Sequence, residues 1–217
     1  MSQLDHLVLG ARTLEEGIAY VEGLMGVVTP PGGEHPDFGT HNCVMQLGPQ
    51  CYFEIIAINP QAPAPVGTRW YGLDDEYQAS QLEQGPALIA WVVAVDDLET
   101  TGQHADWIEG SIKTITRGTM HWQMLLPDKG LLNTPFCPWL IHWPPGQQPH
   151  HRLADLGCNL DSLTVEVPDV VRYEQQLVAA GAAGMIEVRP GNTAQSLLSA
   201  TVLSPRGEVR LTSYPVG

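Results

Sequence analysis

The 217-residue chain is poor in basic residues, and only 16% of its residues are charged. Lysine and arginine together number 10, against 24 aspartates and glutamates, which gives a formal net charge of −14 and a pI of about 4.7. Such an acidic protein repels phosphate backbones and anionic membrane surfaces. The composition therefore argues against a nucleic acid or a membrane as a partner.

Paired cysteines and long apolar runs are also missing. The four cysteines include no CxxC pair, and in a chain of this length they do not indicate a disulfide framework. The first ten residues, MSQLDHLVLG, lack the basic and apolar regions of a signal peptide, and the longest apolar run, ALIAWVVAV, is too short to span a bilayer. We therefore expect a reduced, cytoplasmic protein.

Three stretches of the chain repeat one order of elements, strand–helix–strand–strand–strand. The copies begin at Leu4, Leu88 and Leu160. In the first copy Thr13 and Glu16 form a capping box, after which apolar residues recur at helical spacing. Short strand-like runs punctuated by glycine and proline follow each helix. The pattern predicts an α+β fold built from three βαβββ modules.

The stretches between the copies are long for loops, and loops of that length in compact folds are often functional. We expect residues 1–145 to form one domain and residues 146–217 to form the third module, packed on that domain. Within the first domain the expected parts are a module at 1–59, a linker at 60–85 and a module at 86–145.

Four motifs in the chain are similar to those of a known superfamily. They are LDHLVL on the first expected strand, GGEHPDFGTHN before the second, YFEIIAI on the last strand of the first copy, and RWYGLDD in the linker. Together they resemble the glyoxalase-like-domain branch of the vicinal oxygen chelate superfamily, which includes glyoxalases, extradiol dioxygenases and antibiotic-resistance proteins. The resemblance implies paired modules that form a curved, mostly antiparallel mixed sheet around a concave pocket, with the helices outside.

The resemblance also implies a metal site. Metal-binding members take ligands from the first and last strands of paired modules, and the first copy has His6 and Glu54 there. The second copy has Ala90 at the first position, and aligning YFEI with LIHW places His142 at the other. Two imidazoles and a carboxylate could hold one divalent ion such as Zn, Mn, Ni or Fe. The same side chains could instead be hydrogen-bonded pocket residues without a metal.

The histidine- and glycine-rich loop supplies candidate substrate contacts. The branch that this sequence resembles has a His-x-x-x-Gly-Thr-x-Asn signature, whose polar positions are matched by His35, Thr40 and Asn42. Thr40 and Asn42 face the same side of the strand that follows, so both can lie beside Glu54. Bonding to the local backbone is the alternative role for these residues.

Three further side chains are candidates for substrate contacts. Arg69 is notable because cations are few, and it could bind a substrate carboxylate or pair with Asp74 or Asp75. Trp70 could line an apolar pocket or belong to the core. His121 lies on the polar face of its expected strand.

Three functions remain open from the sequence. The first is a glyoxalase-type lyase or isomerase, in which Glu54 is the metal ligand or the general base. The second is a protein that sequesters a small molecule without chemistry. The third is an extradiol-type dioxygenase that holds Fe(II) with His6, His142 and Glu54. Each would bind a small carbonyl- or oxygen-bearing molecule, and each is expected to be a homodimer.

Overall fold

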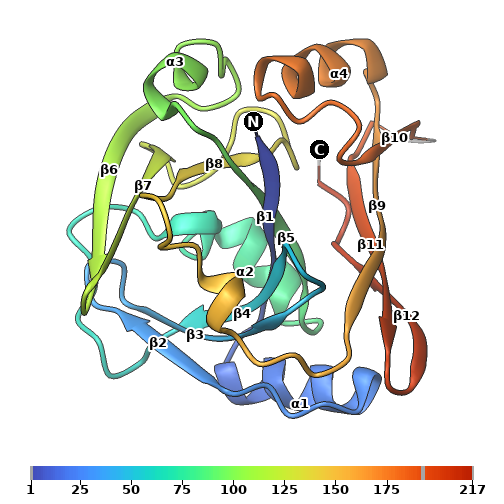
Figure 1. Ribbon diagram of the computed structural model, residues 1–217. Coiled ribbons are helices and arrows are strands. Elements are labelled where there is room, and N and C mark those ends of the chain that lie inside the picture. The colour runs from blue at the N-terminus through green and yellow to red at the C-terminus, as the bar shows by residue number, and fades with distance from the viewer. Residues whose placement is uncertain (1, 192–193, 217) are drawn as a thin grey trace.

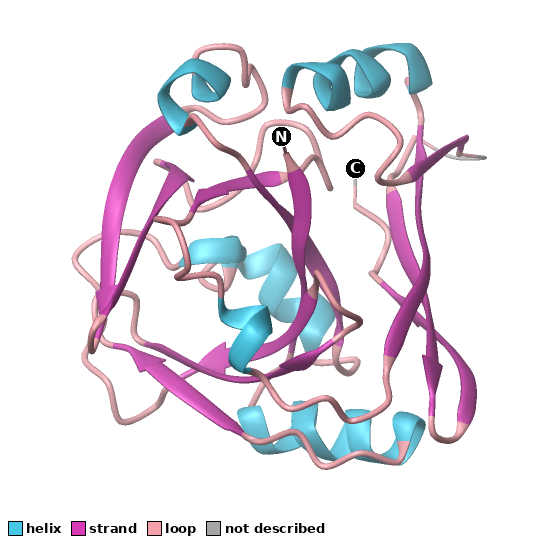
Figure 2. Cartoon of the chain, in the orientation of Figure 1, coloured by secondary structure: helices cyan, strands magenta, loops and turns pink. Residues whose placement is uncertain are grey.

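The computed structural model describes residues 2–191 and 194–216 (Figure 1). Eight strands form one strongly curled sheet, in the order β2-β3-β4-β1-β5-β8-β7-β6 (Figure 2). The strands are β1 (Gln3–Gly10), β2 (Pro31–His35), β3 (Thr40–Gln46), β4 (Tyr52–Ile58), β5 (Ala87–Ala94), β6 (Gly110–Arg117), β7 (Met120–Pro127) and β8 (Trp139–His142).

Two βαβββ modules make this sheet, and they meet at an antiparallel pair of first strands, β1 and β5. Within each module the first strand pairs in parallel with the last, β1 with β4 and β5 with β8. The first two copies of the sequence repeat therefore pair with each other. The predicted α+β class with curved sheets is confirmed.

Helix α1 (Leu14–Met25) covers the convex face of the first module. It begins as the capping box predicts, since the Thr13 hydroxyl accepts a hydrogen bond from the backbone N–H of Glu16 at 3.2 Å. It ends at Gly26, which has a left-handed φ of 73°. Gly17 lets the helix approach the sheet closely, because a Cβ there would lie 2.5 Å from Ile55. In the second module, α3 (Leu98–Gly102) starts at an aspartate cap, Asp97.

The linker between the modules folds and lies on the concave side of the sheet. It contains a 3-10 turn, η1 (Trp70–Gly72), and α2 (Glu76–Leu82), which Figure 1 shows in the centre of the curl. Leu82 packs with Trp70 and Tyr71 in a hydrophobic cluster that also includes inward-facing residues of the sheet. The linker thus fills part of the cup that the paired modules enclose.

A four-stranded sheet covers the opposite, convex face. Its order is β10-β9-β11-β12, so β9 lies between a parallel neighbour and an antiparallel one. The order of elements along the chain repeats that of the modules, but the order of strands in space does not. The elements are β9 (Asn159–Val167), α4 (Val170–Ala179), β10 (Glu187–Pro190), β11 (Leu197–Ser204) and β12 (Gly207–Thr212), preceded by the turn η2 (Pro149–Arg152).

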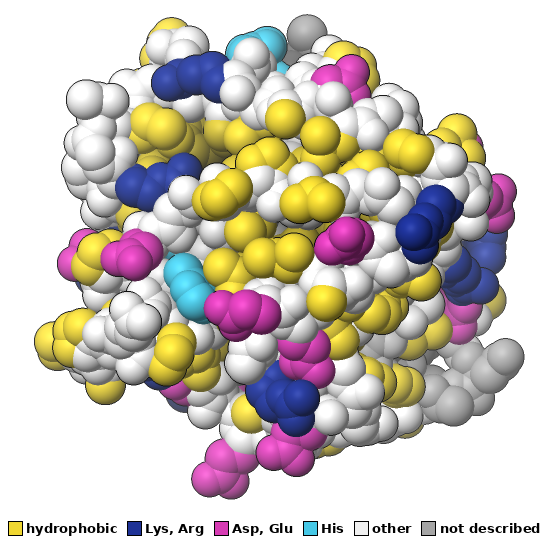
Figure 3. Space-filling view, turned by 90° about the horizontal axis from the view of Figure 1, so that it is seen from below, with side chains coloured by type: hydrophobic (Ala, Val, Ile, Leu, Met, Phe, Trp, Pro, Cys, Tyr) yellow, Lys and Arg dark blue, Asp and Glu magenta, His cyan; other side chains and the backbone are white. Residues whose placement is uncertain are grey.

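Strand alternation divides the apolar side chains into two clusters. Outward residues such as Leu7 and Ile55 join Val165 and Leu198 of the four-stranded sheet in a shared core, whereas inward residues line the cup. None of the helices in the described residues is long and apolar enough to cross a membrane. Charged side chains of both signs are scattered over the face seen from below (Figure 3).

Candidate active site

His6 and Glu54 meet in the middle of the concave face. They lie on the adjacent parallel strands β1 and β4, where even-numbered residues point inward. The Nε2 atom of His6 is 3.4 Å from Oε2 of Glu54, and both side chains are buried. The imidazole stacks on the ring of Tyr52, with centroids 4.3 Å apart and planes 16° apart. The fold thus brings together an imidazole and a carboxylate that lie 48 residues apart in the sequence.

A β-bulge at Asp5 places a second carboxylate against the same histidine. The register between β1 and β5 shifts between Leu4 and His6, so Asp5 is the extra residue. Its Oδ2 lies 2.7 Å from His6 Nδ1, and its Oδ1 accepts the indole N–H of Trp143 at 3.0 Å. Burial alone would lower the pKa of His6, but Asp5 and Glu54 outweigh it and raise the pKa to about 9. His6 is therefore an imidazolium at neutral pH.

Glu54 is held as a carboxylate by a second set of contacts. Asn42 donates its amide N–H to Oε1 of Glu54 at 2.7 Å, and the Asn42 oxygen accepts the backbone N–H of Gly33 at 2.8 Å, which fixes the amide's orientation. Burial would raise the pKa of Glu54, but His6, with help from Asn42, lowers it below its usual range. A side chain at Gly32 of β2 would collide with Asn42, so a glycine is needed there for this approach.

Tyr71 brings a hydroxyl to this pair from the linker. Its oxygen is 3.3 Å from His6 Nε2. Because an imidazolium offers only N–H donors, the Tyr71 oxygen accepts there and its own proton is left to donate elsewhere. Burial, with Glu54 and Asp5, raises the pKa of Tyr71 well above its usual range, which keeps the hydroxyl protonated. Tyr71 has a left-handed φ of 57°, a strained conformation of the kind that clusters at functional sites.

His35, Thr40 and Trp70 form a neighbouring hydrogen-bonded set. The Thr40 hydroxyl lies 3.1 Å from His35 Nδ1 and accepts the Trp70 indole N–H at 3.0 Å. Burial, the largest cause, lowers the pKa of His35 to about 4, so this imidazole is neutral. Thr40 is itself fully buried and does not line a cavity; it holds the other two side chains in place.

Arg117, at the end of β6, reaches across the open edge of the curl toward the signature loop. Its guanidinium nitrogen is 3.5 Å from His35 Nε2, and its guanidinium carbon is 5.9 Å from the centre of the Trp122 ring. Gly33 of β2 leaves room for it, since a Cβ there would lie 2.8 Å from the guanidinium. Arg117 was not among the residues predicted from the sequence, although it ends a strand whose odd-numbered residues Lys113 and Ile115 line the larger cavity of the cup.

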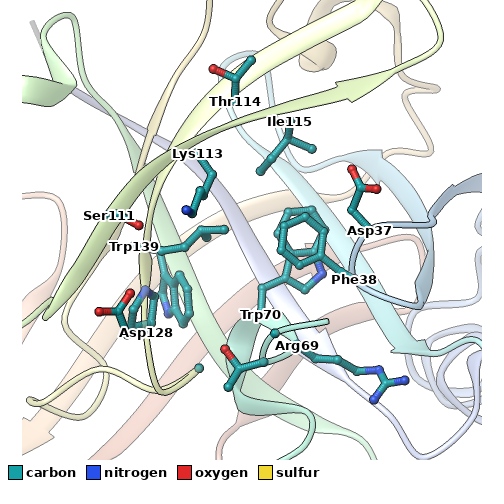
Figure 4. Close-up of a pocket in the computed structure, with 15 residues that line it drawn as sticks. Asp37, Phe38, Arg69, Trp70, Ser111, Lys113, Thr114, Ile115, Asp128 and Trp139 are labelled. Atoms are coloured by element: carbon teal, nitrogen blue, oxygen red, sulfur yellow. The ribbon is translucent and has the colours of Figure 1, made fainter. Parts of the chain in front are cut away.

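Two cavities occupy the cup, and Trp70 lines both. The smaller, about 40 Å³, contains the polar groups just described together with apolar walls. The larger, about 330 Å³, lies beside it and has Phe38 stacked on Trp70 along one wall, with ring centroids 4.2 Å apart, and Trp139 on another (Figure 4). The smaller cavity is lined by His6, His35, Asn42, Val44, Tyr52, Glu54, Trp70, Tyr71, Arg117, Trp122, Met124, Ile141, Trp143 and Pro149.

The structure does not bring the remaining candidates into the polar cavity. Arg69 forms an ion pair with Asp74 and lines the larger cavity. His121 is exposed, and its Nδ1 lies 3.3 Å from the Gln147 amide nitrogen. His142 lies outside the cup, with Nδ1 2.9 Å from the carbonyl oxygen of Val95.

Strand register explains the displacement of His142. Val8 lies opposite Glu54 in the first module, and Val92 lies opposite Trp139 in the second. Across the module junction, His6 pairs with Val92 and Val8 pairs with Ala90. Exchanging the two modules turns one pair into the other, so Val8 of the first module corresponds to Val92 of the second. Trp139 therefore occupies the position of Glu54, and the alignment that placed His142 there was wrong by three residues.

The donors at this site do not fit a divalent metal ion. The first module supplies His6 and Glu54, but the second supplies Ala90 and Trp139 at the matching positions, and catalytic zinc sites use three protein ligands. Over residues 2–191 and 194–216, no group of three or more His, Cys, Asp or Glu side chains could hold a metal.

Residues 4–181 match the family described as glyoxalase-like domain. The chain belongs to this family. Its fold and motifs place it in the glyoxalase-like branch of the vicinal oxygen chelate superfamily. A search of curated proteins found no match.

Solved structures share the fold at low sequence identity. A hypothetical protein from Staphylococcus aureus is 11% identical with a TM-score of 0.56, and the match covers 100% of this chain and 86% of that one. A methylmalonyl-CoA epimerase from Streptomyces coelicolor, in complex with 2-nitronate-propionyl-CoA, is 13% identical with a TM-score of 0.40, covering 68% and 98%. The epimerase from Mycobacterium tuberculosis is 15% identical with a TM-score of 0.39, covering 65% and 88%. At these identities the likeness concerns the fold alone.

Proposed function

We propose that this glyoxalase-like protein is an enzyme that removes a proton from the carbon next to a carbonyl group in a small molecule. The observation that supports the proposal is the arrangement around His6 Nε2, which is 3.4 Å from the Glu54 carboxylate and 3.3 Å from the Tyr71 hydroxyl. A base, a cation and a neutral hydrogen-bond donor thus lie within one small cavity. Enolisation needs these three functions together.

In the proposed step, Glu54 takes the proton from the α-carbon. The C–H electron pair becomes the new C=C bond, and the carbonyl π pair moves onto oxygen, where Tyr71 donates its hydrogen bond. The negative charge moves from Glu54 to the substrate oxygen, and the His6 imidazolium faces both positions. The cation therefore stays neutralised throughout, which lowers the cost of moving the charge in a buried site. Return of the proton to the same or another carbon gives exchange, epimerisation or isomerisation.

The step is written without a metal, because the first module supplies two ligand positions and the second has Ala90 and Trp139 at the matching ones. The Fe(II) dioxygenase expected as a third option would need His142 beside His6 and Glu54, and His142 lies outside the cup. The divalent-ion version predicted from the sequence therefore gives way to a proton-transfer site built from side chains.

The second candidate function is binding without chemistry, and the larger cavity favours it. Its volume of about 330 Å³ is at the lower end for ligand sites, which span roughly 300–1,000 Å³. Phe38, Trp70 and Trp139 give it aromatic walls (Figure 4). A sequestering protein would raise its melting temperature with a ligand held there and leave that ligand unchanged.

Hydrogen–deuterium exchange separates the two functions. A panel of small enolisable ketones, aldehydes and 2-oxo acids is incubated with the protein in D₂O, and loss of the α-proton signal is followed by NMR. We expect at least one compound to exchange faster than in buffer and the Glu54→Gln variant to abolish that excess. Glu34→Gln, an exposed glutamate of β2, is the matched control and should exchange at the wild-type rate. Compounds that bind but exchange only at the buffer rate would support sequestration.

A further inference from the structure

We infer that the substrate of the proposed reaction carries a carboxylate and that Arg117 binds it; this inference rests on the proposed function and narrows it to 2-oxo acids and similar anions. Arg117 lines the same small cavity as Glu54, His6 and Tyr71. The guanidinium is charged at any pH the protein meets. It is thus a permanent cation placed beside the atoms that would carry out the enolisation.

The charge of Arg117 has no carboxylate partner within the described parts of the chain, because none of the ion pairs found there includes it. Among the described residues its one hydrogen-bond contact is the long 3.5 Å approach to His35 Nε2, and its guanidinium carbon lies 5.9 Å from the centre of the Trp122 ring. A guanidinium has five N–H donors in a planar fork that matches a carboxylate. Most of that capacity is free for a ligand.

Its surroundings hold Arg117 in this position. The neutral His35 turns its Nδ1 to Thr40, which leaves the Nε2 lone pair facing the guanidinium. Gly33 gives the side chain space on the opposite edge of the curl. Because β2 and β6 are the two edges of the eight-stranded sheet, Arg117 bridges the open side of the cup.

The other cations near the cup are less suited to this role. Arg69, the candidate for carboxylate binding from the sequence, is neutralised by Asp74. Lys113 lines the larger cavity together with two exposed carboxylates, Asp37 and Asp128. Among the described residues that line the small cavity, Arg117 is the cation that a substrate anion can reach without displacing a carboxylate.

The class of substrate follows from the fact that Arg117 and Tyr71 line the same small cavity. We therefore take the carboxylate on Arg117 and the carbonyl at Tyr71 to be close neighbours in the ligand. Directly bonded carboxylate and carbonyl groups are those of a 2-oxo acid. Its C3 proton is the one that Glu54 would remove.

A matched pair of four-carbon ligands tests the inference. In 2-oxobutanoate a carboxylate is joined to the carbonyl, and in butanone a methyl group replaces it. Affinities are measured by NMR titration for the wild type, Arg117→Met and Lys113→Met, the last on the same strand but lining the other cavity. We expect the wild type to prefer 2-oxobutanoate, Arg117→Met to lose roughly tenfold to a hundredfold of that affinity, and Lys113→Met to change neither ligand.

Three results would overturn the inference: equal affinity of the wild type for both ligands, an unchanged 2-oxobutanoate affinity in Arg117→Met, or a loss in Lys113→Met instead. The comparison of two ligands in the wild type stands even where Arg117→Met does not fold. Exchange at C3, measured with Glu54→Gln, separates this inference from the proposed function. If binding depends on Arg117 but exchange does not depend on Glu54, the anion site is supported and the enolisation is refuted. If only butanone shows Glu54-dependent exchange, the enolisation is supported and the anion site is refuted.

Discussion

At the scale of single residues, the centre of the molecule is a buried imidazolium between two carboxylates. Removing one partner of a buried ion pair costs more than the pair contributes, because it leaves an uncompensated charge. Asp5, His6 and Glu54 are therefore interdependent, and Asn42 and Trp143 satisfy the oxygens that His6 does not. The site therefore stabilises the fold most while His6 keeps its proton and Glu54 is ionised.

The first prediction concerns the pH dependence of stability. The pKa of His6 is raised from 6.5 to about 9, so its contribution is complete below pH 6.5 and is lost as the pH rises through 9. The loss should be about 3 kcal/mol. The folded pKa of Glu54 is lowered instead, so its contribution is present above its usual value of 4.5 and disappears in acid. Urea unfolding from pH 6 to 10 measures the alkaline loss, and an equal loss in His6→Asn would contradict the assignment.

The second prediction concerns the Tyr71 hydroxyl. Tyr71→Phe keeps the ring, which packs edge-on against Trp139 at 4.9 Å, and removes only the donor. The exchange rate should fall roughly a hundredfold, the usual cost of one donor to a developing oxyanion. The melting temperature should stay close to that of the wild type. A variant that exchanges at the full rate would remove Tyr71 from the proposed step.

The sequence predicted part of this residue-level arrangement. His6, Glu54 and Asn42 could be placed together because strand alternation and the loop signature put them on one face. Asp5 could not be placed beside them from the sequence, because it reaches His6 only through a β-bulge that no local sequence pattern predicts. The position of the Tyr71 side chain depends on the left-handed backbone of Tyr71 itself, in the linker. The position of Arg117 in the site depends on the approach of the two edges of the sheet, which are far apart in the sequence.

At the scale of elements, helix signals in the sequence were reliable and strand register was not. The Thr13 cap and Gly26 stop of α1 act over a few residues, so the sequence fixes them locally. The placement of His142 depended on which residue of β8 faces β5, and the pairing of Val92 with Trp139 is a property of the whole sheet. A slip in register changes both the face and the depth of every side chain on a strand.

Two glycines of α1 give the third prediction. Alanine usually stabilises a helix interior by about 1 kcal/mol relative to glycine. At Gly23 nothing lies within 4 Å of an added Cβ, so Gly23→Ala should be stabilising by that amount. At Gly17 the Cβ would press on Ile55, and Gly17→Ala should be destabilising by roughly 1–3 kcal/mol. Chemical denaturation of both variants measures the difference, and stabilisation at Gly17 would show that α1 is not packed so closely on β4.

At the scale of the whole molecule, the four-stranded sheet replaces solvent on the convex face of the cup. The repeat in the sequence predicted a third βαβββ module, and the order of elements along the chain agrees. The pairing differs, because β9 lies between β10 and β11 instead of beside β12, the last strand of its module. The shared core means that the two sheets stabilise each other. The domain limits, the cytoplasmic location and the homodimer remain predictions.

The fourth prediction follows from this shared core. All six tryptophans lie between Trp70 and Trp143, so tryptophan fluorescence reports on the part of the chain that forms the cup. Leu198 is fully buried in the four-stranded sheet, and Leu198→Ala should cost roughly 2–5 kcal/mol. The fluorescence midpoint in urea should fall accordingly and coincide with that from far-UV circular dichroism. A fluorescence midpoint unchanged from the wild type would show that the two sheets unfold independently.

The proposed enolisation uses side chains alone, with Glu54 as the base that removes the proton in the cup. The most direct test is the rate of α-proton exchange by chelator-treated protein, with metal content checked on the same sample and divalent ions added back separately. We expect exchange above the buffer rate in metal-stripped wild type, no gain on addition of Zn, Mn, Ni or Fe, and the buffer rate in Glu54→Gln. Exchange that appears only after a metal ion is restored, or that persists in Glu54→Gln, would contradict it.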